Sequence, residues 1–253
     1  MTIQSNTTLL QELLAEANAM PNADDVYNDG YNVGLEKGKQ AEYDAFWDAY
    51  QQNGERTDYQ YAFYGWGDTF RPKYDLKPIR AEYIFAWCNV TDLETRLLDR
   101  GVVLDLSNCT NTNRAFNRIG TAGDTMDDPD YAAIIPELVL RKSANIAEMF
   151  GYANVRIIRK IILNDQGDQD TSTMFHGGCV NLEEIRFEGV IGKNLRLQWS
   201  SKLSNESVQS IIDHLKDLTG ATAQTLTFHA TVGANLTDTQ KAAISAKNWT
   251  LVY

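Results

Sequence analysis

The chain of 253 residues is poor in several residue types, and each shortage narrows what the protein can be. It has only three cysteines, Cys88, Cys109 and Cys179, and no two of them have the CxxC spacing of a zinc or redox site. An odd number of widely separated cysteines indicates reduced, buried thiols rather than a disulfide framework. Synthesis in a reducing cytoplasm is the simplest inference, and it leaves open a later extracellular life after cell lysis.

Positive charge is also scarce. Lys and Arg number 23 against 34 Asp and Glu, so the formal net charge is -11. Nucleic-acid binding requires a basic face that releases counterions, so this balance argues against a nucleic-acid partner. No run of about 18 apolar residues occurs, and the first residues lack the basic and apolar regions of a secretory signal. We therefore predict no membrane span and no signal peptide.

The residues that usually carry catalysis are few and dispersed. The three histidines, His176, His214 and His229, lie far apart in the sequence and in no HExxH or nucleophile motif. The glycine pair at 65–67 lacks the strand-to-helix context of a nucleotide-binding loop. We therefore predict a protein that is not an enzyme and that holds no cofactor.

What the chain does have is a repeated spacing of apolar residues. It occurs as Ile135-x-x-Leu138-x-Leu140, Ile158-x-x-Ile161-x-Leu163 and Leu182-x-x-Ile185-x-Phe187, at nearly equal intervals. Met-Phe pairs precede the two later copies, at 149–150 and 174–175. A fixed period in this range is typical of stacked repeats, whose units bury their faces only against each other. The pattern therefore predicts a binding or structural surface rather than a catalytic pocket.

Related apolar pairs extend the pattern to six expected strands. The inward pairs are Leu104/Leu106, Leu138/Leu140, Ile161/Leu163, Ile185/Phe187, Leu195/Leu197 and Leu226/Phe228. Because side chains alternate along a strand, the residues between them face outward. These outward residues include our candidate ligand-binding residues Asp105, Val139, Ile162, Arg186 and Arg196, and neighbouring outward sites include Glu137, Lys160, Glu184 and Asn194.

Two interpretations of this outward face stay open. Mixed charge on a sheet is most often a solvated face without a ligand. The adjacent apolar pair Val139 and Ile162, however, requires a cover, because an exposed apolar patch often marks a contact surface. The N-terminal helices or a partner chain are the expected covers.

The N-terminal part has helical periodicity at 8–20 and again at 24–52. In the second segment Gly30, Gly34 and Gly38 recur at intervals of one helical turn, and each costs about 1 kcal/mol relative to Ala in an exposed helix. A stripe of small residues allows a second helix to approach closely, so the pattern predicts a homo-oligomer. The alternative is a weakly helical, flexible stem. Beyond it, the aromatic-rich segment up to residue 80 indicates a cap on an apolar core or, alternatively, a carbohydrate platform.

The C-terminal part has clear helix signals. Residues 204–218 have the apolar stripe of an amphipathic helix, and Ser204 can cap that helix. Thr237 and Gln240 have the spacing of a capping box at the start of a second helix. Residues 249–253 have the composition of a terminal strand.

Two acidic clusters offer oxygen ligands, but we assign no metal. One comprises Asp124, Asp127, Asp128 and Asp130, and the other comprises Asp165, Asp168 and Asp170 with Asn164 nearby. Neither has the loop spacing of an EF-hand, and Asp and Asn are ordinary turn formers. Asp165, Asp168 and Asp170 are the weak calcium candidate.

The Met-Phe pairs and the apolar triplets that follow them, at 149–163 and 174–187, resemble the BspA-like leucine-rich repeats of bacterial and phage surface proteins. The segments at 43–51, 70–74, 101–109 and 188–194, and the ending at 203–212 and 248–251, are similar to proteins encoded by phages and prophages of gut Firmicutes. The resemblance covers most of the chain beyond about residue 24, and the insertion at 124–130 departs from it. It implies a virion-associated or cell-surface protein that contacts a host, with no catalytic residues to carry over.

Together these observations predict an α+β fold. We expect a helical stem at 1–52 that oligomerises or anchors the chain, an aromatic-rich collar at 53–80, and at 81–253 a short, irregular leucine-rich-repeat solenoid with C-terminal helices. The expected function is a non-catalytic structural or host-attachment protein of a phage virion, made in the host cytoplasm. Its expected partners are other virion proteins, through the stem, and a host surface protein or glycan. A bacterial surface or secreted adhesin is the alternative, and a cell-wall glycan enzyme is the third.

Overall fold

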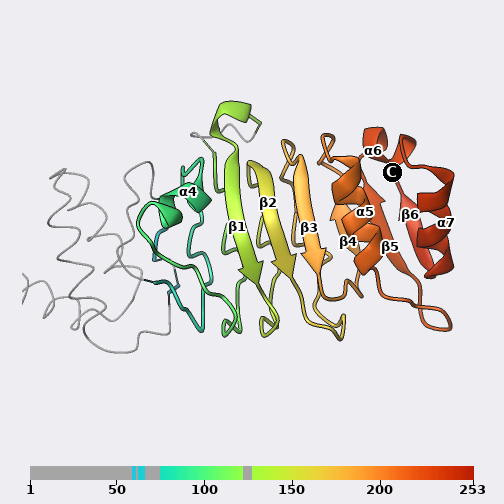
Figure 1. The fold of residues 1–253 in the computed structure, drawn as a ribbon, viewed down its shortest axis with the longest axis horizontal. Coiled ribbons are helices and arrows are strands. Elements are labelled where there is room, and N and C mark those ends of the chain that lie inside the picture. Colours follow the sequence, from blue (N-terminus) through green and yellow to red (C-terminus); the bar gives the residue numbers. More distant parts are fainter. Residues whose placement is uncertain (1–58, 61, 66–74, 122–126) are drawn as a thin grey trace, which may run out of the picture. The chain divides into compact units, whose positions relative to one another are not determined.

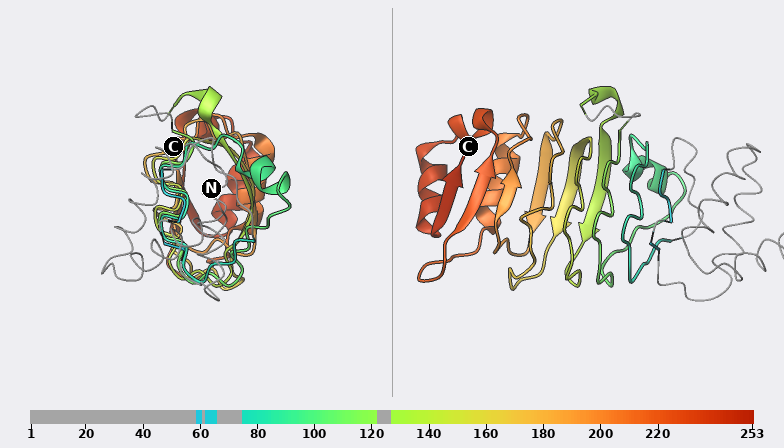
Figure 2. Two further views of the ribbon diagram at one scale, coloured as in Figure 1. Left: turned by 90° about the vertical axis from the view of Figure 1, so that its left-hand side faces the viewer. Right: turned by 180° about the vertical axis from the view of Figure 1, so that it is seen from behind.

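A computed structural model describes residues 59–60, 62–65, 75–121 and 127–253. They belong to one compact unit, Asp58–Tyr253. The predicted stem at 1–52, with Gly30, Gly34 and Gly38, lies outside the described residues, as does much of the predicted collar at 53–80. Within the described part, the elements follow one another in chain order from α4 to α7 and β6 (Figure 1; Figure 2 shows them from the end and from behind).

The first sheet contains two residues of each apolar triplet, and the remaining residue of each lies just outside the strand. Its parallel strands β1 (Ala133–Val139), β2 (Val155–Ile162) and β3 (Glu184–Glu188) lie in the order β1-β2-β3 (Figure 1). Ile158 pairs with Ile135 on one side and with Ile185 on the other, and the next inward positions, Leu138, Ile161 and Phe187, pair in the same way. All six side chains are buried. The triplets lie side by side but are not aligned position by position. Ile185 and Phe187, the second and third residues of the last triplet, pair with Ile158 and Ile161, the first and second residues of the triplet before it.

A second parallel sheet follows, in the order β4 (Leu195–Leu197), β5 (Gln224–Phe228) and β6 (Trp249–Val252). Leu195 pairs with Leu226 and Leu197 with Phe228, and these four side chains are buried as predicted. The predicted terminal strand is β6. The expected strand at Leu104/Leu106 is absent, since Leu104 makes only an isolated bridge to Leu76.

The predicted fold class, an α+β chain built on one leucine-rich-repeat solenoid, is wrong. The structure is a mixed α/β fold with two small parallel three-stranded sheets and few helices. No further strand pairs with the free edge of β3. The helix α5 (Asn205–His214), which follows β4 in the chain, lies along this edge instead. The Ser207 hydroxyl accepts a hydrogen bond from the Ile185 N–H at 3.0 Å, and the Ser210 hydroxyl accepts one from the Phe187 N–H at 3.0 Å. These side chains take the place of the carbonyl groups of a further strand, so the first sheet ends there.

This arrangement makes a stability prediction for the edge of β3. Replacing both Ser207 and Ser210 with Ala leaves two strand N–H groups without acceptors, one of them buried, so we expect a loss of about 2 kcal/mol in the free energy of unfolding. Urea denaturation of the full chain measures it. The control is Ser245→Ala on the exposed side of α7, which should change stability by less than about 0.5 kcal/mol. Equal stability of the two variants would refute this role of the hydroxyls.

The remaining helices cover the other edge of the first sheet and the C-terminal end. The helix α4 (Leu93–Leu98) follows Thr91, whose carbonyl accepts the N–H of Ile134 on β1 at 2.8 Å. A short 3-10 helix, Pro129–Tyr131, precedes β1. At the other end lie α6 (Ala230–Ala234) and α7 (Asp238–Ala246), and the predicted capping box of Thr237 and Gln240 is confirmed. Across the described ranges, no helix combines the length and apolarity that a bilayer crossing requires.

Within the described residues, five phenylalanine rings form a stack that is a second part of the core. Neighbouring rings are 5.2 to 5.5 Å apart between centroids and nearly parallel, in the order Phe63, Phe85, Phe116, Phe150 and Phe175. Backbone hydrogen bonds join the turns that carry them, for example from Phe116 N–H to the Met149 carbonyl at 2.9 Å. This phenylalanine stack includes the phenylalanine of both Met-Phe pairs and extends beyond them.

Candidate binding site on the first sheet

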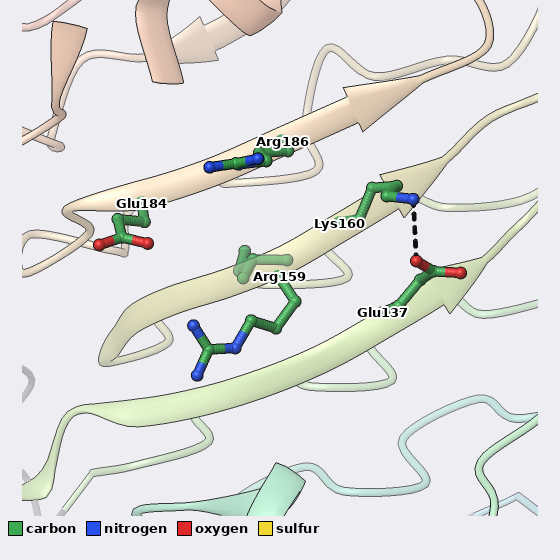
Figure 3. Close-up of a pocket in the computed structure, with 6 residues that line it drawn as sticks. Glu137, Arg159, Lys160, Glu184 and Arg186 are labelled. Carbon is green, nitrogen blue, oxygen red and sulfur yellow. Dashed lines mark ion pairs between the residues drawn. The ribbon is translucent and has the colours of Figure 1, made fainter. Parts of the chain in front are cut away.

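The outer face of the first sheet has a shallow depression with a volume of about 290 Å³. The parallel register brings outward positions of the three strands next to one another, so charged side chains from all three meet there. Glu137 comes from β1, and the other side chains come from β2 and β3 (Figure 3). The lining residues are Glu137, Ile158, Arg159, Lys160, Glu184 and Arg186.

Most charges on this face are paired across strands. Lys160 Nζ lies 3.0 Å from a Glu137 carboxylate oxygen and 3.6 Å from one of Glu188 (Figure 3 shows the first pair). The hydrogen bond with Glu137 raises the pKa of Lys160. Arg141 continues the chain of pairs to Glu188 at 2.8 Å and to Asp165 at 3.2 Å. Because such exposed pairs contribute about 1 kcal/mol or less each, they hold the side chains in position more than they stabilise the fold.

On β2, Arg159 is turned away from this chain of pairs. Its Nε lies 2.8 Å from a carboxylate oxygen of Glu94, so it is anchored to α4. The register shift between Ile158 and Ile161 places two consecutive residues, Arg159 and Lys160, on the outer face. Strict alternation does not foresee this, and Arg159 is the lining residue that the sequence analysis missed.

The charges of β3 inside the depression are unpaired. Glu184 and Arg186 are both exposed, and neither side chain has an ion pair or a hydrogen bond with another residue that the structure describes (Figure 3). A guanidinium offers five N–H donors in a fixed geometry, and a carboxylate offers acceptors only. This edge of the depression therefore presents one donor group and one acceptor group to a ligand.

The five candidate ligand-binding residues do not gather in one place. Arg186 alone lines the depression, and Arg196 is exposed on β4 of the second sheet. Val139 and Ile162 are register partners on β1 and β2, but Ile162 is only 7% exposed and Val139 is half-buried, so they form no open apolar patch. Asp105 lies outside the strands, where hydrogen bonds from Ser107 lower the pKa of its carboxyl group.

The three carboxylates of the weak calcium candidate each bind a different residue of the chain. Asp165 pairs with Arg141, Asp168 accepts a hydrogen bond from the Asn164 amide at 2.7 Å, and Asp170 accepts one from Ser172 N–H at 2.9 Å. The bonds with Ser172 lower the pKa of Asp170. Over the part of the chain that the structure covers, no three His, Cys, Asp or Glu side chains lie close enough to hold a metal ion. Asp124 of the other cluster lies outside that part.

The cysteines and histidines occupy separate positions. All three cysteines are free and buried, as predicted, and burial raises the pKa of Cys109 to about 11 and raises those of Cys88 and Cys179. Their thiols are therefore protonated and unreactive at neutral pH. His176 lies exposed in its turn, and His229 caps α6 by accepting the Thr231 N–H at 3.1 Å.

The chemistry that this face offers is recognition by charge. An arrangement of one open guanidinium and one open carboxylate beside a self-paired network suits a ligand that carries a donor and an acceptor of its own. No nucleophile is paired with a base within the depression. No protein-family model, curated protein or solved structure matches this chain.

Proposed function

We propose that the protein is a non-catalytic recognition protein of a phage virion, which attaches to a host-surface protein or glycan through the outer face of its first sheet. The observation that carries the proposal is that Arg186 and Glu184, which both line the depression, have no side-chain partner among the described residues. The resemblance to phage-encoded proteins supplies the virion setting, and residues 1–52 are the proposed attachment to other virion proteins in a homo-oligomer.

The contrast between strands supports this assignment. Among the residues that line the depression, the charged side chains of β1 and β2 pair with each other or with α4, whereas the two opposite charges of β3 have no partner among the described residues. Ion pairs hold the surrounding side chains, so little conformational entropy is lost there when a ligand binds. The open guanidinium then supplies orientation, since a charge-assisted hydrogen bond is about twice as strong as a neutral one.

Charge reversal at Arg186 tests the proposal. The full chain and its variant are each labelled with a fluorophore. Arg186→Glu should bind Firmicutes host cells at least about tenfold more weakly than the unmodified chain, which is a loss of about 1.4 kcal/mol in binding free energy. Flow cytometry measures the binding. The control, Arg156→Glu, makes the same change at an exposed arginine of β2 that does not line the depression, and it should bind as the unmodified chain does.

Two results would contradict the proposal. Equal binding by Arg186→Glu and the unmodified chain would remove the sheet face from recognition. Absence of the chain from purified phage particles, measured by mass spectrometry, would remove it from the virion and favour the bacterial adhesin.

A further inference from the structure

A second row of side chains lies on the turns that carry the phenylalanine stack, away from the sheet face. It consists of Trp87, Arg118, Tyr152 and His176, and we name it the arginine column. Trp87, Arg118 and Tyr152 each have a left-handed backbone, with φ of 59°, 55° and 52°, at the same point of successive turns. Backbone hydrogen bonds hold the turns together, among them Arg118 N–H to the Gly151 carbonyl at 2.9 Å and Tyr152 N–H to the His176 carbonyl at 2.8 Å.

Arg118 is held between two aromatic rings. Its guanidinium carbon lies 4.3 Å from the centre of the Trp87 ring and 5.2 Å from the centre of the Tyr152 ring. The Tyr152 and His176 rings lie 5.4 Å apart between centroids in an edge-to-face arrangement. Cation–π attraction at the Trp87 and Tyr152 rings fixes the guanidinium without using its N–H donors.

Those donors have no acceptor among the residues that the structure describes. The Arg118 guanidinium makes no hydrogen bond or ion pair with any residue of the described ranges, although the chain as a whole is acidic. Arg114, in the same turn, differs: its Nε and Nη2 donate to the two Glu148 carboxylate oxygens at 3.0 Å each. At the matching position of the next turn Arg118 meets Tyr152 instead of a carboxylate. The fold therefore positions one arginine for an internal acid and one for an external acid.

We propose that Arg118 binds the carboxylate of an acidic sugar, with the rims of Trp87 and Tyr152 contacting the sugar ring and His176 flanking it. The planar guanidinium matches a carboxylate with two parallel hydrogen bonds. The adjoining aromatic side chains supply apolar surface for the C–H groups of a pyranose, and Trp87 is 38% exposed. An acidic peptide offers the carboxylate without the ring. This site goes beyond the proposed function because it uses none of the sheet-face residues.

Isothermal titration calorimetry on the full chain tests the site. The probes are a trimer of α-1,4-linked galacturonate and the uncharged trimer of galactose with the same linkage. We expect the galacturonate trimer to bind at least about tenfold more tightly than the galactose trimer, and its affinity to fall as salt is raised. Arg118→Gln should weaken galacturonate binding at least about tenfold. Arg118→Lys, which keeps the charge but loses the planar fork, should also weaken it.

The control Arg156→Gln changes an exposed arginine that belongs to neither site, and it should bind the galacturonate trimer as the unmodified chain does. The test of the sheet face measures cell binding by Arg186→Glu, so the two tests fail independently. Equal affinity for the two trimers would overturn the role of the carboxylate. Unchanged binding by both Arg118 variants would overturn the site. Hexaglutamate binding that exceeds galacturonate binding and is lost in Arg118→Gln would replace the acidic sugar with an acidic polypeptide.

Discussion

Phe116→Ala should lower the free energy of unfolding by about 4 kcal/mol. Phe116 is fully buried in the middle of the phenylalanine stack, with Phe85 at 5.4 Å on one side and Phe150 at 5.3 Å on the other. The truncation loses the transfer energy of the ring and leaves a cavity. It also breaks two ring pairs, each worth about 0.5 to 1.5 kcal/mol beyond area burial.

Urea denaturation of the full chain measures this loss. Two further variants serve as comparisons, one for the contribution of the ring pairs and one for an exposed ring. Phe116→Leu keeps most of the volume but removes the ring pairs, so it should fall between the unmodified chain and Phe116→Ala. Trp199→Ala removes a large ring that is 49% exposed and should cost less than about 0.5 kcal/mol. A cost below about 1 kcal/mol for Phe116→Ala would mean that the stack does not hold the turns together.

The phenylalanine stack was not predicted from the sequence, because the residues that precede its rings differ. Phe150 and Phe175 follow Met, whereas Phe116 follows Ala and Phe85 follows Ile, so no repeated pair of letters marks them. The inward triplets were easier to find, since burial on strands with equal spacing leaves only apolar residues at fixed positions. The end of the first sheet could not be predicted, because the hydroxyls of α5 replace a strand through tertiary contacts that periodicity does not encode.

The candidate sites were also predicted only in part. Strict alternation along a strand placed Arg186 on the outer face, and the structure agrees. Alternation failed at Ile162, which is buried, and at Arg159, which was missed, because β2 has a register shift. The arginine column has a sequence pattern that was overlooked: Trp87, Arg118 and Tyr152 each stand two residues after a ring of the phenylalanine stack. Aligning the turns on phenylalanine would have revealed it.

Gly189→Ala should cost about 3 kcal/mol more than the same change at Gly220. Both glycines have a left-handed backbone, with φ of 79° and 78°, so each substitution carries the same conformational strain, about 1 to 2 kcal/mol. They differ in their surroundings. A Cβ at Gly189 would lie 2.3 Å from the Leu163 carbonyl oxygen and 2.8 Å from the carbonyl carbon, whereas nothing lies within 4 Å of a Cβ at Gly220.

The clash at Gly189 is with backbone, so no side-chain rotation relieves it. Relief requires β2 and β3 to separate where they end, at the hydrogen bonds from Leu163 N–H to the Glu188 carbonyl and from Val190 N–H to the Asn164 carbonyl. Because both variants change glycine to alanine, their effects on the unfolded chain cancel in the difference. Urea midpoints of the two variants give that difference. Equal midpoints would mean that the ends of β2 and β3 move apart freely. The first sheet would then be less rigid at these strand ends than the short distances between the two segments imply.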